Sequence, residues 1–285
     1  MSSRHHSINE PRVATLSDNE AVRRLIARAW RVYLRFPPED LPARLRPGLG
    51  WVAGTGAELS AFLLVEIQPF LIGLITGAAV SDEWRVSAYL DTFLPLLEAA
   101  VRPQGAGALA QIGYAPWLAP VLRERGFVSR DWVVTYEWHY QPMVVRGNQA
   151  VAVRSAHLRD LPTLLSLDQE VFGPLWHKPA SSFEEALAQA FLFTVAEMDG
   201  QILGYQWCEK HEAHGHLTRL AVRPGWEGQG VGTRLLTEAL VAMVKGGTHW
   251  VTLNTQESNL RSQMLYERHG FRRTDERVPV LWKDL

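Results

Sequence analysis

The chain has 285 residues, 47% of them hydrophobic, and a formal net charge of −1. That length allows one or two domains with a full core, and the composition excludes a disordered chain. The balanced charge gives no general attraction to nucleic acid, so no nucleic-acid partner is expected.

The cysteine and hydropathy patterns indicate the compartment. One cysteine, Cys208, excludes an internal disulfide and fits a reducing cytoplasm. No charged-then-apolar leader opens the sequence. The most apolar run, 62–79, is interrupted by Glu66, Gln68 and Pro69 and is expected to form two strands. We therefore expect a cytoplasmic protein with no membrane partner.

The first half predicts an alternation of strands and helices. Apolar runs and turn residues place strands at 12–16, 50–54, 59–67, 72–80, 109–114 and 132–140. Apolar residues at helical spacing place helices at 19–33, 88–101 and 117–125. Ser17 or Asp18 is expected to cap the first of these helices.

The same order begins again after a segment rich in Pro, Gly and Asn at 141–150, which we interpret as a linker. Strands are expected at 152–154, 191–198, 201–209, 217–222, 249–255 and 271–282. Helices are expected at 158–171, 183–190, 235–245 and 259–268.

Two segments of the halves also match in sequence. Residues 76–84 align with 218–226 at an offset of 218 − 76 = 142. Residues 125–127 align with 269–271 at an offset of 144. A repeat at a fixed offset indicates a duplicated unit. We predict an α/β protein of two tandem domains, each a mixed central β-sheet flanked by helices. The predicted boundaries are 1–140, a linker at 141–150, and 151–285.

The second half has a glycine-rich loop between a strand and a helix, with glycines at 225, 228, 230 and 232. Such a loop lets amides approach a ligand, and the helix start adds unpaired N–H groups and partial positive charge. A loop that needs glycine only for its turn is the alternative. Four glycines in eight residues favour a phosphate or pyrophosphate site. Gly232-Thr233-Arg234 fits neither the Gly-Lys-Ser/Thr nor the dinucleotide pattern.

This stretch resembles the acetyl-CoA loop of the GNAT superfamily of N-acetyltransferases. The matching residues are Leu220-Ala221-Val222-Arg223-Pro224, then Gly230-Val231-Gly232, then Leu235-Leu236. The resemblance implies acetyl-CoA as cosubstrate and no metal. It implies pyrophosphate binding by Gly228, Gln229, Gly230, Val231, Gly232 and Thr233. It also implies that backbone N–H groups of Leu220, Ala221 and Val222 hold the pantetheine arm and polarise the acetyl carbonyl. Glu227 departs from the family's Arg or Gln and is expected to lower affinity.

A second landmark is Asn259, followed by Tyr266 and by Gly270-Phe271. Seven residues are nearly two helical turns, so Asn259 and Tyr266 share a helix face. This pattern is similar to the family's Asn-x-x-Ala-x-x-x-Tyr-x-x-x-Gly-Phe. The resemblance implies that Tyr266 gives a proton to the leaving thiolate and that Asn259 contacts the CoA arm.

An amine acceptor must lose a proton before it attacks. His216 lies six residues before Val222, where one branch of the family has a glutamate and another a histidine. Its ordinary pKa near neutrality suits a base, although it is also explained as a surface histidine at a hairpin end. Glu209 and a water chain are the alternatives. Cys208 as a nucleophile is less expected than Cys208 as packing.

The first half has lost the corresponding features. Val86, Ala88 and Leu90 replace the loop glycines, and Leu122 and Ala115 replace the tyrosine and asparagine. Bulky residues would block close approach of a backbone to a pyrophosphate. We therefore expect a degenerate copy, which packs against the second half or binds another ligand.

The resemblance implies N-acetyl transfer to a small-molecule or peptide amine by direct attack in a ternary complex, with the acceptor near loop 173–178. The alternative is a non-catalytic acyl-CoA-binding or regulatory protein. The retained loop glycines and Tyr266 favour the enzyme.

Overall fold

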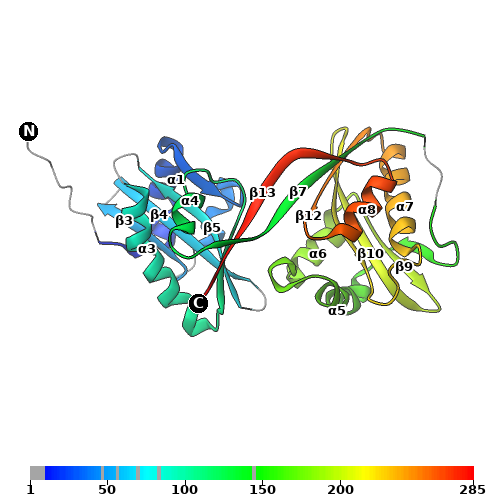
Figure 1. Cartoon of the computed structure of the whole chain (residues 1–285), viewed down its shortest axis with the longest axis horizontal. Helices are drawn as coiled ribbons and strands as arrows, with labels where there is room; N and C mark the ends of the chain where they lie inside the picture. Colours follow the sequence, from blue (N-terminus) through cyan, green and yellow to red (C-terminus); the bar gives the residue numbers. More distant parts are fainter. Residues whose placement is uncertain (1–9, 46–47, 56–57, 69–70, 82–84, 143–145) are drawn as a thin grey trace, which may run out of the picture. The chain divides into compact units, whose positions relative to one another are not determined.

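The structure is a computed structural model that describes residues 10–45, 48–55, 58–68, 71–81, 85–142 and 146–285 (Figure 1). Parts of the predicted repeat (82–84) and linker (143–145) lie outside these ranges. The fold is α/β, as predicted. Its contacts divide the chain into a first unit, up to Arg130 together with Val278–Leu285, and a second unit, Asp131–Arg277.

The described residues of the first unit form α-helices of unequal length, the longest of them α3, together with the strands of a sheet. Its helices are α1 (Asn19–Arg28), α2 (Leu41–Arg44), α3 (Val86–Val101) and α4 (Ala119–Arg123). Its strands are β1 (Arg12–Val13), β2 (Arg31–Leu34), β3 (Gly50–Thr55), β4 (Glu58–Gln68), β5 (Ile72–Val80) and β6 (Ala108–Ile112).

The second unit follows the same order, with a helix where the first unit has β2 and α2. Its helices are α5 (Leu161–Val171), α6 (Ala180–Gln189), α7 (Val231–Lys245) and α8 (Leu260–Arg268). Its strands are β8 (Ala152–Ser155), β9 (Leu192–Met198), β10 (Gln201–His211), β11 (His214–Val222) and β12 (Trp250–Gln256). Two further strands, β7 (Val128–His139) and β13 (Arg272–Asp284), carry the chain between the units. No helix in the described ranges is long and apolar enough to span a bilayer.

Each unit has a β-bulge in the equivalent strand, β5 in the first unit and β11 in the second. In the first, Leu64 pairs with Gly77 and Val65 with Ile75, so Thr76 is an extra residue in β5. In the second, the shift between β10 and β11 leaves Thr218 as the extra residue. Two such β-bulges, 142 residues apart, lie at the predicted offset. With the repeated element order, they confirm the tandem arrangement.

Next to each bulge, two parallel strands separate. β5 pairs with β6 only as far as Ile75, and β11 pairs with β12 only as far as Leu217. Beyond these residues the two parallel strands of each unit no longer pair, and we call the region between them the opening. The units differ in what lies there.

In the first unit β2 fills the opening, and the predicted helix 19–33 is correct only as far as Arg28. α1 ends at Arg28, and β2 pairs antiparallel with residues 77–80 of β5. The Tyr33 hydroxyl donates to the carbonyls of Ile112 at 2.7 Å and Ile75 at 3.3 Å, which belong to the two separated strands. The backbone hydrogen-bonding groups along this edge of β5 thus pair with β2. This pairing overrides the helical pattern of the sequence.

The two connecting strands complete the sheet of the other half. Residues 133–139 of β7 pair with β12 in the second unit. Residues 280–284 of β13 pair with β6 in the first unit. The chain therefore divides at 130/131 and 277/278, which differs from the expected division at 141–150. The expected division at 141–150 would require the last strand of each half to complete the sheet of that same half.

Helices cover both faces of the sheet in the second unit. α7 and α8 pack on one face, with Leu236, Leu240 and Leu253 among the buried residues. α5 and α6 pack on the other, where Phe183 contacts Tyr205 and Trp207. α7 and α8 follow the carboxyl ends of the parallel strands β11 and β12. In α/β sheets, ligands bind in the crevice at such ends.

Candidate active site

The opening in the second unit has an unpaired strand edge. β11 pairs with β10 up to Val222, but beyond Leu217 no strand of the described residues pairs with its other edge. The N–H of Arg223 donates to the Leu203 carbonyl of β10 at 2.7 Å. Because N–H groups alternate in direction along a strand, those of Val222 and Leu220 face the opening. That of Ala221 faces β10.

The predicted glycine loop joins this edge to α7. Gly225, Gly228 and Gly230 have φ values of +87°, +76° and +82°, which side chains rarely adopt. Gly230 is the N-cap of α7, so N–H groups of the first turn, including those of Val231, Gly232 and Thr233, have no partner within the helix. The Gln229 amide donates to the Gly225 carbonyl at 2.7 Å and stabilises the loop.

Gly232 has a packing role. A Cβ atom there would lie 3.3 Å from both Leu265 Cδ2 of α8 and Val222 Cγ2 of β11. These contacts are tighter than most Cβ contacts, so a larger side chain would separate α7 from α8 and β11. The glycine therefore brings the helix start close to the strand edge.

The negative charge of Glu227 is paired with groups next to it in the fold. One carboxylate oxygen accepts from the Gly225 N–H at 2.9 Å, and the other lies 3.0 Å from the guanidinium of Arg261 on α8. An exposed cation thus lies next to the acid that departs from the family pattern. Arg261 carries no local sequence signal for this role, because only the fold brings α8 to the loop.

Asn259 and Tyr266 have different environments on α8. The Asn259 side chain caps the helix by accepting from the Ser262 N–H at 3.1 Å. The ring of Tyr266 is buried against Tyr136 and Phe271. Burial raises the pKa of Tyr266 to about 12, while its contact with the Ser262 hydroxyl lowers it. The Tyr266 hydroxyl therefore stays protonated near neutral pH.

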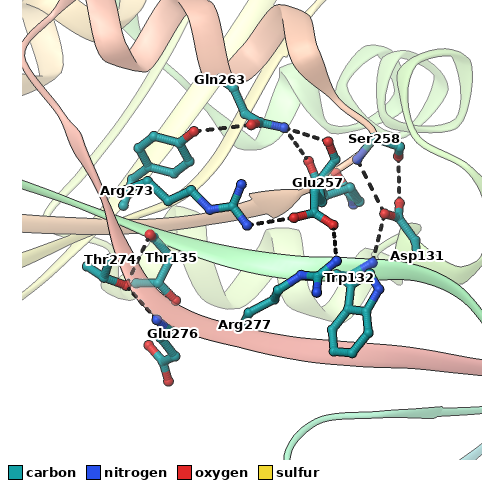
Figure 2. A network of polar contacts seen from close by, with 12 residues as sticks. Asp131, Trp132, Thr135, Glu257, Ser258, Gln263, Arg273, Thr274, Glu276 and Arg277 are labelled. Carbon is teal, nitrogen blue, oxygen red and sulfur yellow. Dashed lines mark hydrogen bonds and ion pairs between the residues drawn. The ribbon is translucent and has the colours of Figure 1, made fainter.

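A polar network holds the turn that leads into α8 (Figure 2). Glu257 accepts from Arg273 at 2.6 Å and from Arg277 at 2.5 Å. The Asp131 carboxylate accepts from the Ser258 hydroxyl at 2.6 Å. These bonds tie the two connecting strands to the end of β12, and so fix where α8 begins.

The two base candidates are cross-strand partners. His216 of β11 pairs with Glu209 of β10, so their side chains share a sheet face. His216 Nδ1 lies 2.9 Å from the Thr252 hydroxyl of β12, which also lies 2.9 Å from His214 Nε2. Burial lowers the pKa of His216, and the nearby Glu209 charge opposes this shift. A neutral imidazole is the form that accepts a proton.

Cys208 is a packing residue. Its side chain is fully buried, and burial raises the pKa of the thiol well above its ordinary value. The thiolate is the nucleophilic form of cysteine, so this environment opposes nucleophilic catalysis. Within the described residues, no group of three or more His, Cys, Asp or Glu side chains is placed to hold a metal ion.

A pocket of about 590 Å³ opens on the same sheet face as Glu209. α6 and β10 supply most of its lining, and Thr218 at the bulge of β11 reaches it. The Thr218 hydroxyl is buried and has no hydrogen-bond partner among the described residues. The pocket therefore leads from the surface to the bulge beside the opening.

A buried ion pair connects the bulge to loop 173–178. Arg219 follows Thr218 and binds Asp168 of α5 at 2.5 Å, and its guanidinium also donates to the Trp176 carbonyl at 2.8 Å. Asp168 further accepts from the Lys178 N–H at 3.1 Å. This pair was not predicted from the sequence, although an arginine within the apolar run Leu217–Val222 is a signal for a buried partner.

Comparison with known proteins agrees with this geometry. Residues 161–271 match the model of the Acetyltransferase (GNAT) family. A mycothiol acetyltransferase from Acidimicrobium ferrooxidans is 29% identical over 129 residues, 44% of this chain and 37% of that protein. The chain thus spans little more than a third of that relative. Another, from Actinosynnema mirum, is 28% identical over 89% of this chain and 92% of its own length.

A solved structure shows the same fold over both halves. The tandem GNAT protein from the clavulanic acid biosynthesis pathway matches with a TM-score of 0.62 and 15% sequence identity, over 96% of this chain and 97% of its own. At this identity the likeness concerns the fold alone. It agrees with the two tandem GNAT-like domains expected from the sequence.

Proposed function

We propose that the chain is an acetyltransferase of the GNAT family and that its second unit transfers an acetyl group from acetyl-CoA to an amine by direct attack in a ternary complex. The observation that carries this proposal is the unpaired edge of β11 beside the glycine loop. A backbone edge and a free helix N-terminus are together suited to an amide-containing arm that ends in a pyrophosphate.

The directions of the backbone N–H groups indicate which part of acetyl-CoA each of them binds. The N–H groups of Leu220 and Val222 hold the pantetheine arm. The N–H groups from Gly228 to Thr233 surround the pyrophosphate, and Arg261 lies near enough to Glu227 to add a positive charge at the loop. Ala221 contributes packing, because its N–H faces β10 and its side chain is buried.

The reaction needs two proton movements. Acetyl-CoA supplies an activated acetyl thioester, and the amine nitrogen forms the new C–N bond as the C–S bond breaks. His216 accepts the proton that the amine loses, directly or through water, and Tyr266 donates one to the thiolate sulfur. Backbone N–H groups near the bulge polarise the acetyl carbonyl.

The alternative is a protein that binds acyl-CoA without turnover. Both proton-transfer candidates are present in suitable forms, since His216 is held neutral and Tyr266 is held protonated. This favours the enzyme.

Thiol release separates the two functions. Purified protein is incubated with acetyl-CoA and a panel of amines, free CoA thiol is followed, and the product mass is measured. The enzyme predicts amine-dependent thiol release with a product heavier by one acetyl group. Saturable acetyl-CoA binding with no amine-dependent release would favour the binding protein.

A further inference from the structure

The segment 147–151, which we call the linker turn, packs on the start of α7. The N–H of Asn148 donates to the Gly230 carbonyl at 3.2 Å. Val151 is buried in the same apolar cluster as Leu235 of α7. The glycine loop of the candidate site therefore has a structural partner, which comes from the end of the predicted linker.

Two glycines allow this close packing of backbone on backbone. Gly147 has a φ of +99° and Gly230 a φ of +82°. A Cβ atom at Gly147 would lie 2.6 Å from the Gly230 carbonyl oxygen and still closer to the backbone nitrogen of Arg234. A Cβ atom at Gly230 would lie 2.9 Å from the backbone nitrogen of Asn148. Gly230 is thus required by the linker turn as well as by its own backbone conformation.

The hydrogen bond from Asn148 acts on the peptide unit that begins α7. The Gly230 carbonyl accepts from Asn148 and also, at 2.9 Å, from the N–H of Arg234. In a planar trans peptide the C=O and N–H groups point in opposite directions. The N–H of the same peptide, that of Val231, therefore points away from the linker turn and out of the helix N-terminus. Hydrogen bonds to a carbonyl also polarise the N–H of its peptide, which makes that group a stronger donor.

We propose that the linker turn is a positioning element of the cosubstrate site, and that its fit depends on Gly147. This inference rests on the proposed binding of acetyl-CoA by the glycine loop. The docked turn holds the first N–H groups of α7 in the direction that the pyrophosphate needs, so they do not have to reorient on binding. Docking of the turn and binding of acetyl-CoA then stabilise each other.

Substitution of Gly147 tests the proposal. Gly147→Ala places a methyl group against the backbone of Gly230 and displaces the linker turn. Acetyl-CoA should bind about tenfold more weakly, which is the size of one hydrogen bond to a charged group. The KM for the amine, and kcat at saturating acetyl-CoA, should stay at their wild-type values, because the proposed proton-transfer groups lie on β11 and α8. Calorimetric titration and steady-state kinetics measure these quantities.

Gly247→Ala is the matched control. Gly247 has a φ of +85° and lies just beyond the other end of α7, where a Cβ atom would meet nothing within 4 Å among the described residues. Both variants carry the strain of an alanine at positive φ, so both should lose some thermal stability. Only Gly147→Ala should lose affinity for acetyl-CoA.

Hydrogen exchange in the wild-type protein gives a second measurement, which does not depend on the folding of a variant. Acetyl-CoA should slow exchange of the Asn148 amide more than that of the Gly247 amide, which donates to the Val244 carbonyl at 2.9 Å. The proposal is overturned if the two variants bind acetyl-CoA equally well, or if the ligand protects the two amides equally. Failure of the wild-type protein to bind acetyl-CoA would instead contradict the proposed function.

Discussion

Burial favours the neutral forms of the two side chains that we propose for proton transfer. Tyr266 is buried and His216 is half-buried, and in each case burial favours the neutral form. For histidine the neutral form is the base, and for tyrosine it is the acid. The same physical effect therefore prepares both residues for their proposed roles.

The first prediction concerns the acid. Tyr266→Phe keeps the buried ring and removes the hydroxyl, so acetyl-CoA affinity should survive while kcat falls about 10²–10⁴-fold. Turnover and calorimetric titration measure the two effects. Tyr140→Phe is the matched control, because Tyr140 is an exposed tyrosine of the same unit. Equal turnover of the two variants would remove Tyr266 from the mechanism.

The second prediction concerns the base and pH. A neutral His216 is needed, so the rate should fall as pH drops through its pKa. Because burial lowers that pKa, the fall should occur below the ordinary histidine value of about 6.5. His216→Ala should lose about 10²–10⁴-fold near neutrality and recover partly at high pH, where more acceptor is already deprotonated.

Rate–pH profiles of wild type and His216→Ala test this assignment. An unchanged rate and profile would transfer the role to Glu209 or to a water chain.

The third prediction concerns Glu227. Glu227→Gln keeps an oxygen for the Gly225 N–H but removes the charge that holds Arg261. Acetyl-CoA should bind about two- to fivefold more tightly at low salt, since an exposed pair contributes under about 1 kcal/mol. The gain should shrink at high salt.

Titration at two ionic strengths measures the gain. Glu212→Gln, in the turn at the far end of β11, should leave affinity unchanged. A gain of the same size in both variants, or none in Glu227→Gln, would contradict a local effect on the pyrophosphate.

At the scale of elements, the two openings differ in whether the strand edge beside them is paired. β2 occupies one edge with four paired residues, whereas β11 keeps the equivalent edge available. The glycines lost around Val86 are one barrier to a cofactor in the first unit. The occupied edge of β5 is a second one, which the sequence analysis did not anticipate.

The fourth prediction concerns β13. Deleting residues 278–285 removes the partner of β6, including the fully buried Leu281 and the ion pair of Lys283 with Glu98. The first unit should be destabilised, although the deleted residues lie at the end of the second half. Hydrogen exchange should accelerate in β6 more than in β12.

Leu281→Ala is the milder version, with an expected loss of about 2–5 kcal/mol in the unfolding of the first unit. Acetyl-CoA binding by the second unit should persist in it. Faster exchange in β12 than in β6 would contradict the assignment of β13 to the first unit.

At the scale of the molecule, the two copies of one fold differ in whether the edge of the strand beside the bulge is paired. The fifth prediction is one acetyl-CoA site per chain, because among the residues that the structure describes only the second unit has both a free strand edge and a glycine loop. Calorimetric titration should give a stoichiometry near one. Two equal sites would show that β2 leaves its place when ligand is present.

The sequence alone determined the features that depend on local chemistry. Glycine spacing located the loop before α7, the 142-residue offset predicted the repeat, and the pattern from Asn259 to Phe271 located α8. Each of these signals lies within a short stretch, where backbone geometry restricts residue type directly.

Tertiary structure decided what depends on pairing between distant segments. Arg31–Leu34 has a helical pattern, yet the free edge of β5 makes it a strand. β7 and β13 pair with the sheet of the other half, which no local pattern indicates. The links of Arg219 to Asp168 and of Glu227 to Arg261 likewise join residues that only the fold brings together. Backbone groups and buried charges must find partners wherever the chain supplies them, so these contacts follow from the whole fold.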